Sequence, residues 1–100
     1  MPHRVPVTVK LELVEGTAAE LPGRTFVEVK GVMYAHLAGS QNLSNCTLLV
    51  TRDGQTIELG LSNAHDGSKV SETAFGWRFN LEMADPYHQP SRATVEATRL

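Results

Sequence analysis

The sequence predicts an all-β domain, an antiparallel β-sandwich of six or seven strands, with a small closed β-barrel as the alternative. Three observations lead to this prediction. Apolar residues recur at every second position over most of the chain, turn-forming residues separate the alternating runs, and no long window has the 3.6-residue period of a helix. Strands with one polar face bury their apolar faces in two packed sheets or in a barrel.

The first strand is expected over residues 5–15. Its odd-numbered positions up to position 13 are all valine or leucine, whereas Thr8, Lys10 and Glu12 lie on the other face. The segment Leu21-Pro22-Gly23-Arg24 follows, with proline and glycine at the two central positions of a type II turn. We therefore expect the chain to turn here into a second strand.

A second alternating run is expected over residues 24–37, with Gly31 in its middle. Because a glycine inside such a run often marks a bulge or a bend, the run is predicted to form one bent strand or two short ones. Residues 39–45 are small and polar, which is typical of a loop. One parity of the run carries Thr25, Val27, Val29, Met33, Ala35 and Leu37.

Two further strands, residues 46–51 and 55–61, flank Asp53-Gly54. This dipeptide readily adopts the positive φ angles of a two-residue hairpin turn, so the two strands are predicted to form a hairpin. Residues 62–71 are rich in asparagine, aspartate, glycine and serine, and are expected to form an exposed loop.

The run over residues 74–84 is predicted to face the middle of the core. Residues 85–90, with the sequence DPYHQP, contain two prolines that are incompatible with regular pairing, and a last strand is expected over residues 92–99. Half of the six aromatic residues of the chain lie on one face of the 74–84 run, which carries Phe75, Trp77, Phe79, Leu81 and Met83.

Length and charge limit the function. A chain of 100 residues is the size of one domain, which we expect over residues 1–100. The formal net charge of −2 argues against nucleic acid or an anionic membrane as a partner, because both are captured by concentrated positive charge. The sequence has no signal-peptide pattern, no membrane-spanning apolar stretch and a single cysteine, so we expect a protein of the cytoplasm or of a larger assembly.

No pattern in the sequence indicates catalysis, and we expect a protein that is not an enzyme and uses no cofactor. Cys46 begins a strand whose next residues of the same parity are apolar, so it is expected to be buried as a small hydrophobic residue. The sequence has no Gly-x-Ser-x-Gly segment and no glycine-rich phosphate loop, since its eight glycines are scattered singly.

The weak candidates for a metal site are His65, Asp66 and His88. They lie in the predicted loops, without the short-range spacing that brings three or four donors together. The loop around Asp66 is rich in oxygen donors but lacks the spacing of an EF-hand, and its residues equally favour a turn. We therefore expect no metal site.

The candidate binding surface is an apolar patch on the second run. Phe26, Val32 and Tyr34 share parity with charged residues, so they are expected to interrupt a polar sheet face, as partner-binding patches do. Alternatively, the 85–90 loop, which carries Tyr87, covers Phe26 and Tyr34.

This patch, with Tyr87, predicts a non-enzymatic protein-binding or assembly module, a structural or accessory subunit that self-associates or docks on a larger complex. The expected partner is therefore a protein or a second copy of the chain. The alternative is a small protein that binds a ligand or a metal, with its site in the loops 39–45, 62–71 and 85–90, because loops often cluster at one end of a sandwich.

Overall fold

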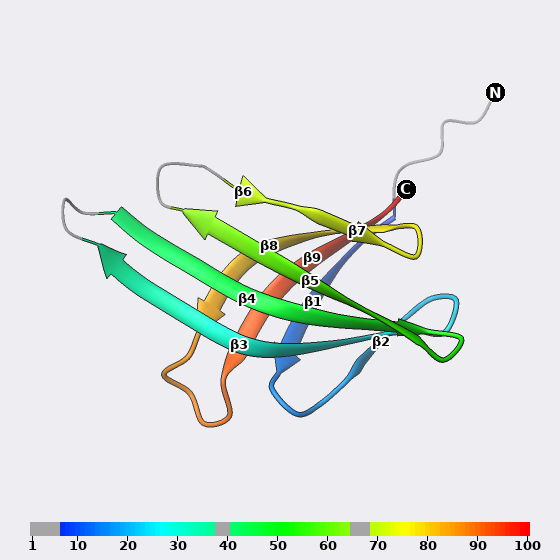
Figure 1. Ribbon diagram of the computed structural model, residues 1–100, viewed down its shortest axis with the longest axis horizontal. Helices are drawn as coiled ribbons and strands as arrows, with labels where there is room; N and C mark the ends of the chain where they lie inside the picture. The colour runs from blue at the N-terminus through cyan, green and yellow to red at the C-terminus, as the bar shows by residue number, and fades with distance from the viewer. Residues whose placement is uncertain (1–6, 38–40, 65–68) are drawn as a thin grey trace.

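The computed structural model describes residues 7–37, 41–64 and 69–100, which fold into two antiparallel sheets (Figure 1). The four-stranded sheet has the order β1-β9-β8-β7, and the five-stranded sheet has the order β2-β3-β4-β5-β6. The four-stranded sheet comprises β1 (Thr8–Val14), β9 (Arg92–Arg99), β8 (Trp77–Asp85) and β7 (Glu72–Ala74). The five-stranded sheet comprises β2 (Ala19–Leu21), β3 (Thr25–Leu37), β4 (Gln41–Arg52), β5 (Gln55–Ala64) and β6 (Lys69–Val70).

The prediction of an all-β protein is confirmed, and the alternative of a closed barrel is wrong. In the described ranges the strands form two separate sheets, with no pairing that joins them into one. The part of the chain that the structure describes has nine strands instead of the expected six or seven, because β2, β6 and β7 are pieces of two or three residues at the sheet edges. Single-sequence patterns do not reveal such short pieces, since they are too brief to show a period.

Two predicted loops are partly strand. β4 begins at Gln41 and β5 continues to Ala64. The polar residues there favour a loop by composition, but they form strands because β4 pairs with β3 on one side and with β5 on the other. The predicted run over 74–84 is interrupted instead, because Phe75 and Gly76 have φ angles of 53° and 82° and turn the chain between β7 and β8.

The predicted hairpin at Asp53-Gly54 is confirmed. Asp53 and Gly54 have φ angles of 50° and 76°, and Arg52 pairs with Gln55 across the turn. Positive φ angles at both central residues match the right-handed twist of the flanking strands, which is why this dipeptide suits the position.

Buried apolar residues from both sheets form one cluster between them. In Figure 1 the sheets lie one behind the other, and β3, β4 and β5 extend past the end of β8. Phe79 and Val95 of the four-stranded sheet and Val29, Leu48 and Val50 of the five-stranded sheet are fully buried. The alternation read from the sequence therefore places most of the core correctly.

A bulge in β3 reverses this alternation. Lys30 pairs with Thr47 and Met33 pairs with Asn45, so two β3 residues, Gly31 and Val32, stand opposite one residue of β4. Gly31 has a φ of 61°, the left-handed conformation that the first residue of such a bulge needs and that glycine adopts without strain. Val32 is consequently 8% exposed and Met33 is 56% exposed. The expectation that Val32 lies on the polar face is wrong: its side chain belongs to the core.

A second bulge lies in β8, between Leu81 and Met83. The extra residue, Glu82, moves Met83 to the outer face and places Ala84 in the core, so the predicted core position of Met83 is also wrong. β7 pairs with β8 only as far as Phe79, so beyond it no strand in the described ranges satisfies the backbone groups of β8 on that side. Asn63 of β5 bonds to two of them: its Nδ2 donates to the carbonyls of Leu81 at 3.0 Å and of Glu82 at 3.5 Å. This side chain links the two sheets.

Candidate functional site

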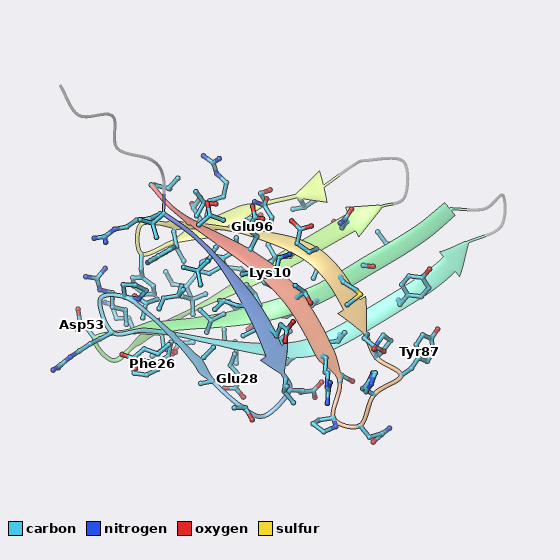
Figure 2. All side chains as sticks on the ribbon, turned by 180° about the vertical axis from the view of Figure 1, so that it is seen from behind. Lys10, Phe26, Glu28, Asp53, Tyr87 and Glu96 are labelled. Atoms are coloured by element: carbon cyan, nitrogen blue, oxygen red, sulfur yellow. The ribbon has the colours of Figure 1, made fainter. Side chains whose placement is uncertain are left out.

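Tyr34 and Tyr87 meet where the five-stranded sheet extends past β8. Tyr34 pairs with Ser44, which shares its face of β4 with buried Cys46, so the β3 bulge has turned Tyr34 toward the inner side of the sheet. Tyr87 lies in the loop between β8 and β9 (Figure 2), and the two rings meet edge to face with centroids 6.4 Å apart. Tyr34 is 37% and Tyr87 is 79% exposed, so the loop covers Tyr34 only in part.

The carboxylate of Asp85 holds this loop in place. Its Oδ1 accepts a hydrogen bond from the Tyr87 amide at 3.1 Å, and its Oδ2 lies 2.5 Å from Nδ1 of His88. Desolvation raises the pKa of Asp85, but the hydrogen bonds from His88 and Tyr87 lower it by more than desolvation raises it. The pKa of Asp85 therefore lies below its ordinary value. The ionised carboxylate can only accept, so Nδ1 of His88 carries the proton and Nε2 is directed away from this bond.

Phe26 belongs to a different part of the surface. It is exposed and pairs with Thr51, on the outer face of the five-stranded sheet. Phe26 and Tyr34 are eight positions apart, a separation of roughly 26 Å along a strand. Figure 2 shows Phe26 and Tyr87 far apart, on opposite sides of the view. The sequence-predicted patch of Phe26, Val32 and Tyr34 therefore does not exist as one surface, because the bulge separates its members.

The tyrosine pair lies beside an open strand edge. β2 pairs with β3 only from Thr25 to Val27, so over residues 28–37 no strand in the described ranges pairs with that side of β3 (Figure 1). Unpaired backbone N–H and C=O groups along such an edge are able to accept another strand. We call Tyr34, Tyr87 and this length of β3 the tyrosine edge.

A cavity of about 440 Å³ lies on the outer face of the four-stranded sheet, near the start of the same loop. Glu12 and Met83 pair with Thr94 from either side, and Val14 and Asp85 likewise pair with Arg92, so the register places these side chains on one face. Charged groups of both signs thus stand beside an apolar wall. The cavity is lined by Glu12, Leu13, Val14, Met83, Asp85, His88, Arg92, Ala93 and Thr94.

Of the weak metal candidates, only His88 lies within the described residues, where it is paired with Asp85. His65 and Asp66 lie outside them. Within residues 7–37, 41–64 and 69–100, no three histidine, cysteine, aspartate or glutamate side chains come together as metal ligands.

Cys46 is buried in the core, as predicted. Burial raises the pKa of its thiol to about 11. The thiolate is the nucleophilic form of cysteine, so this side chain is inert at neutral pH.

Sequence reasoning missed the Asp85–His88 pair, the cavity and the open length of β3. The three-residue spacing of Asp85 and His88 beside a proline could have indicated the first, since an aspartate at a turn often bonds to the backbone two residues later. The other two depend on which strands become neighbours, and no local signal carries that information.

No protein-family model matches this chain, and neither a curated protein nor a solved structure matches it. Among the residues that the structure describes, no helix is long and apolar enough to cross a membrane.

Proposed function

We propose that this protein is a non-enzymatic protein-binding or assembly module, a structural or accessory subunit that associates with itself or docks on a larger complex. The observation that carries the proposal is the tyrosine edge, where unpaired backbone of β3 lies beside two partly exposed aromatic rings. Tyrosine is enriched in protein interfaces because its ring contributes apolar area while its hydroxyl bonds to polar groups.

Strand addition is the mode of binding that fits this edge. A partner strand placed beside β3 gains main-chain hydrogen bonds, and neighbouring side chains supply specificity. The bulge at Gly31 interrupts the edge, so the docking segment begins beyond it, at Met33. Tyr34 and Tyr87 flank the partner on the inner side, and exposed Met33 flanks it on the outer side.

The test compares a double variant, Tyr34→Ser with Tyr87→Ser, against Phe26→Ser as a matched control at the other end. Sedimentation equilibrium of each purified chain measures self-association, and affinity capture with mass spectrometry identifies a larger complex. We expect the double variant to lose the association made through the tyrosine edge, namely capture of a larger complex or self-association beyond a dimer, which the control keeps. A wild-type chain that is monomeric and retains no specific partner contradicts the proposal.

We infer that the two sheets form a β-sandwich, in which their apolar faces pack on each other. The shared buried cluster and the bond from Asn63 to the carbonyl of Leu81 support this. The lone cysteine, buried as a free thiol, fits a reducing compartment, and we place the protein in the cytoplasm or in a larger assembly there.

A second candidate function is the binding of a small ligand, and the cavity beside the β8–β9 loop is the observation that favours it. Glu12 and Arg92 offer a site for one cationic and one anionic group, with Met83 and Val14 as apolar contacts. Titration with benzylamine and with benzoate, followed by backbone amide spectra, tests it. Shifts at Thr94 and Arg92 with one probe would support the ligand site, and spectra unchanged by both would contradict it.

A further inference from the structure

The outer edge of β1 presents alternate residues of its backbone to solvent. The amide of Arg99 donates to the carbonyl of Val7 and the amide of Glu15 donates to the carbonyl of Ser91, both at 2.8 Å. In an antiparallel ladder, residues bonded to the neighbouring strand alternate with residues whose N–H and C=O groups point away. The odd-numbered residues of β1 therefore bond to β9, and the even-numbered residues 8–14 direct their backbone groups outward.

No strand in the described ranges pairs with this edge, and of the features that usually prevent pairing β1 carries only charged side chains, Lys10 and Glu12. Its seven residues keep one uninterrupted register with β9 and contain no proline. Three other long strands also have open lengths in the described ranges. Bulges interrupt those of β3 and of β8, and β5, which is unpaired on one side over residues 55–61, carries a single charge there, Glu58. Edge strands commonly carry bulges, prolines, charged side chains or short lengths that prevent pairing with another chain.

The sequence of β1, TVKLELV, is complementary to itself in antiparallel orientation. With Leu11 opposite Leu11 of a second copy, Lys10 stands opposite Glu12 of that copy and Glu12 opposite its Lys10. Val9 stands opposite Leu13, and the inner and outer faces of the two strands coincide. Opposite charges in directly facing positions stabilise such a pair, and there are two of these contacts in each dimer.

The charges also select this register over its neighbours. A shift of two residues in one direction places Lys10 opposite Lys10, and a shift in the other direction places Glu12 opposite Glu12. A shift of one residue exchanges the two faces and exposes the apolar side. Lys10, which is labelled in Figure 2, and Glu12 are both exposed on the outer face of the sheet, where they are available to a second copy.

We propose that two copies of this chain associate through their β1 strands, antiparallel and with Leu11 on the twofold axis, so that the two four-stranded sheets become one continuous sheet. This deepens the proposed function by naming the partner as a second copy, and it uses an edge other than the tyrosine edge. The outward backbone groups of residues 8, 10, 12 and 14 supply the hydrogen bonds of the interface.

The test exploits the charge pattern. Glu12→Lys replaces both Lys–Glu contacts of the dimer by contacts between two lysines. Lys10→Glu replaces both by contacts between two glutamates. Each variant alone is expected to raise the dimer dissociation constant roughly tenfold or more, because two attractive contacts become repulsive. An equimolar mixture of the two variants restores every unlike pair, so it is expected to form a mixed dimer at close to the wild-type affinity.

Glu72→Lys is the matched control, since it makes the same charge change on β7 at the opposite edge of the same sheet, and it is expected to leave dimerisation unchanged. Lys10 also faces Glu96 of β9 within the same chain, so Lys10→Glu could weaken the fold itself. Thermal unfolding of each variant therefore verifies that it is folded. Sedimentation equilibrium is the measurement. A wild-type chain that stays monomeric at its highest soluble concentration overturns the β1 dimer. A dimer equally sensitive to Glu72→Lys, or insensitive to Glu12→Lys, overturns it while leaving the proposed assembly function intact.

Discussion

The ring of Tyr34 in β3 meets the ring of Tyr87 in the β8–β9 loop edge to face, with an angle of 66° between the ring planes. This contact joins the end of the five-stranded sheet that extends past β8 to the β8–β9 loop of the four-stranded sheet. Aromatic pairs in this geometry are worth about 0.5–1.5 kcal/mol beyond the area they bury. Because Tyr87 is largely exposed, the lower end of that range is expected here.

A double-mutant cycle with Tyr34→Ala and Tyr87→Ala measures this contact. We expect a coupling of about 0.5 kcal/mol in the free energy of unfolding, obtained from urea denaturation. Losses that add without coupling would show that the rings contribute independently.

The pKa of Asp85 is predicted to depend on His88. The hydrogen bonds of ionised Asp85 lower its pKa in the folded state, so they stabilise the folded protein at neutral pH. This contribution to the free energy of unfolding is lost as the pH falls through the folded-state pKa. Carbon-detected NMR titration of the carboxyl group is expected to show an upward shift of the Asp85 pKa in His88→Ala. An Asp85 pKa identical in both proteins would contradict the pairing.

Asn63→Ala is predicted to lower the free energy of unfolding by about 1–2 kcal/mol, because it leaves the carbonyl of Leu81 without its donor. Chemical denaturation measures the effect. Asn45→Ala is the control: Asn45 lies on the opposite face of the neighbouring strand, and its loss is expected to cost less. Equal losses would mean that the bond between the sheets contributes nothing.

Thr25→Val is predicted to raise the free energy of unfolding by about 1 kcal/mol. Thr25 is fully buried, and its Oγ1 has no hydrogen-bond partner among the described residues. An unsatisfied buried hydroxyl is costly, and valine fills the same shape without it. Thr25→Ala, which removes the methyl group as well, is expected to destabilise. A less stable valine variant would reveal a partner for the hydroxyl.

Cys46 is predicted to resist alkylation in the folded protein. With a thiol pKa of about 11, only about one molecule in a thousand carries the thiolate at pH 8, and burial excludes the reagent as well. We expect iodoacetamide to label the chain at least ~100-fold faster in denaturant than in buffer, as followed by mass spectrometry. Comparable rates in both conditions would place the thiol at the surface.

The partner-binding prediction had a sound local basis and a wrong geometry. Phe26, Val32 and Tyr34 do share a parity in the sequence, yet the bulge at Gly31 puts Val32 in the core and turns Tyr34 to the face opposite Phe26. The sequence indicates a possible bulge at Gly31, but the effect of the bulge on the residues after it depends on how β3 and β4 align. Of the alternative, in which the 85–90 loop covers Phe26 and Tyr34, the structure shows only the contact of Tyr87 with a partly exposed Tyr34.

By itself the sequence determined the all-β class, the hairpin at Asp53-Gly54 and the burial of residues such as Phe79 and Cys46, because alternation and turn chemistry act over a few neighbouring residues. Only the tertiary structure decided which strands lie at the edges, where the two bulges reverse the alternation, and which side chains surround the β8–β9 loop. Those features arise from pairings between distant segments, such as β1 with β9, and a single extra residue in a strand exchanges the buried and exposed faces of everything that follows.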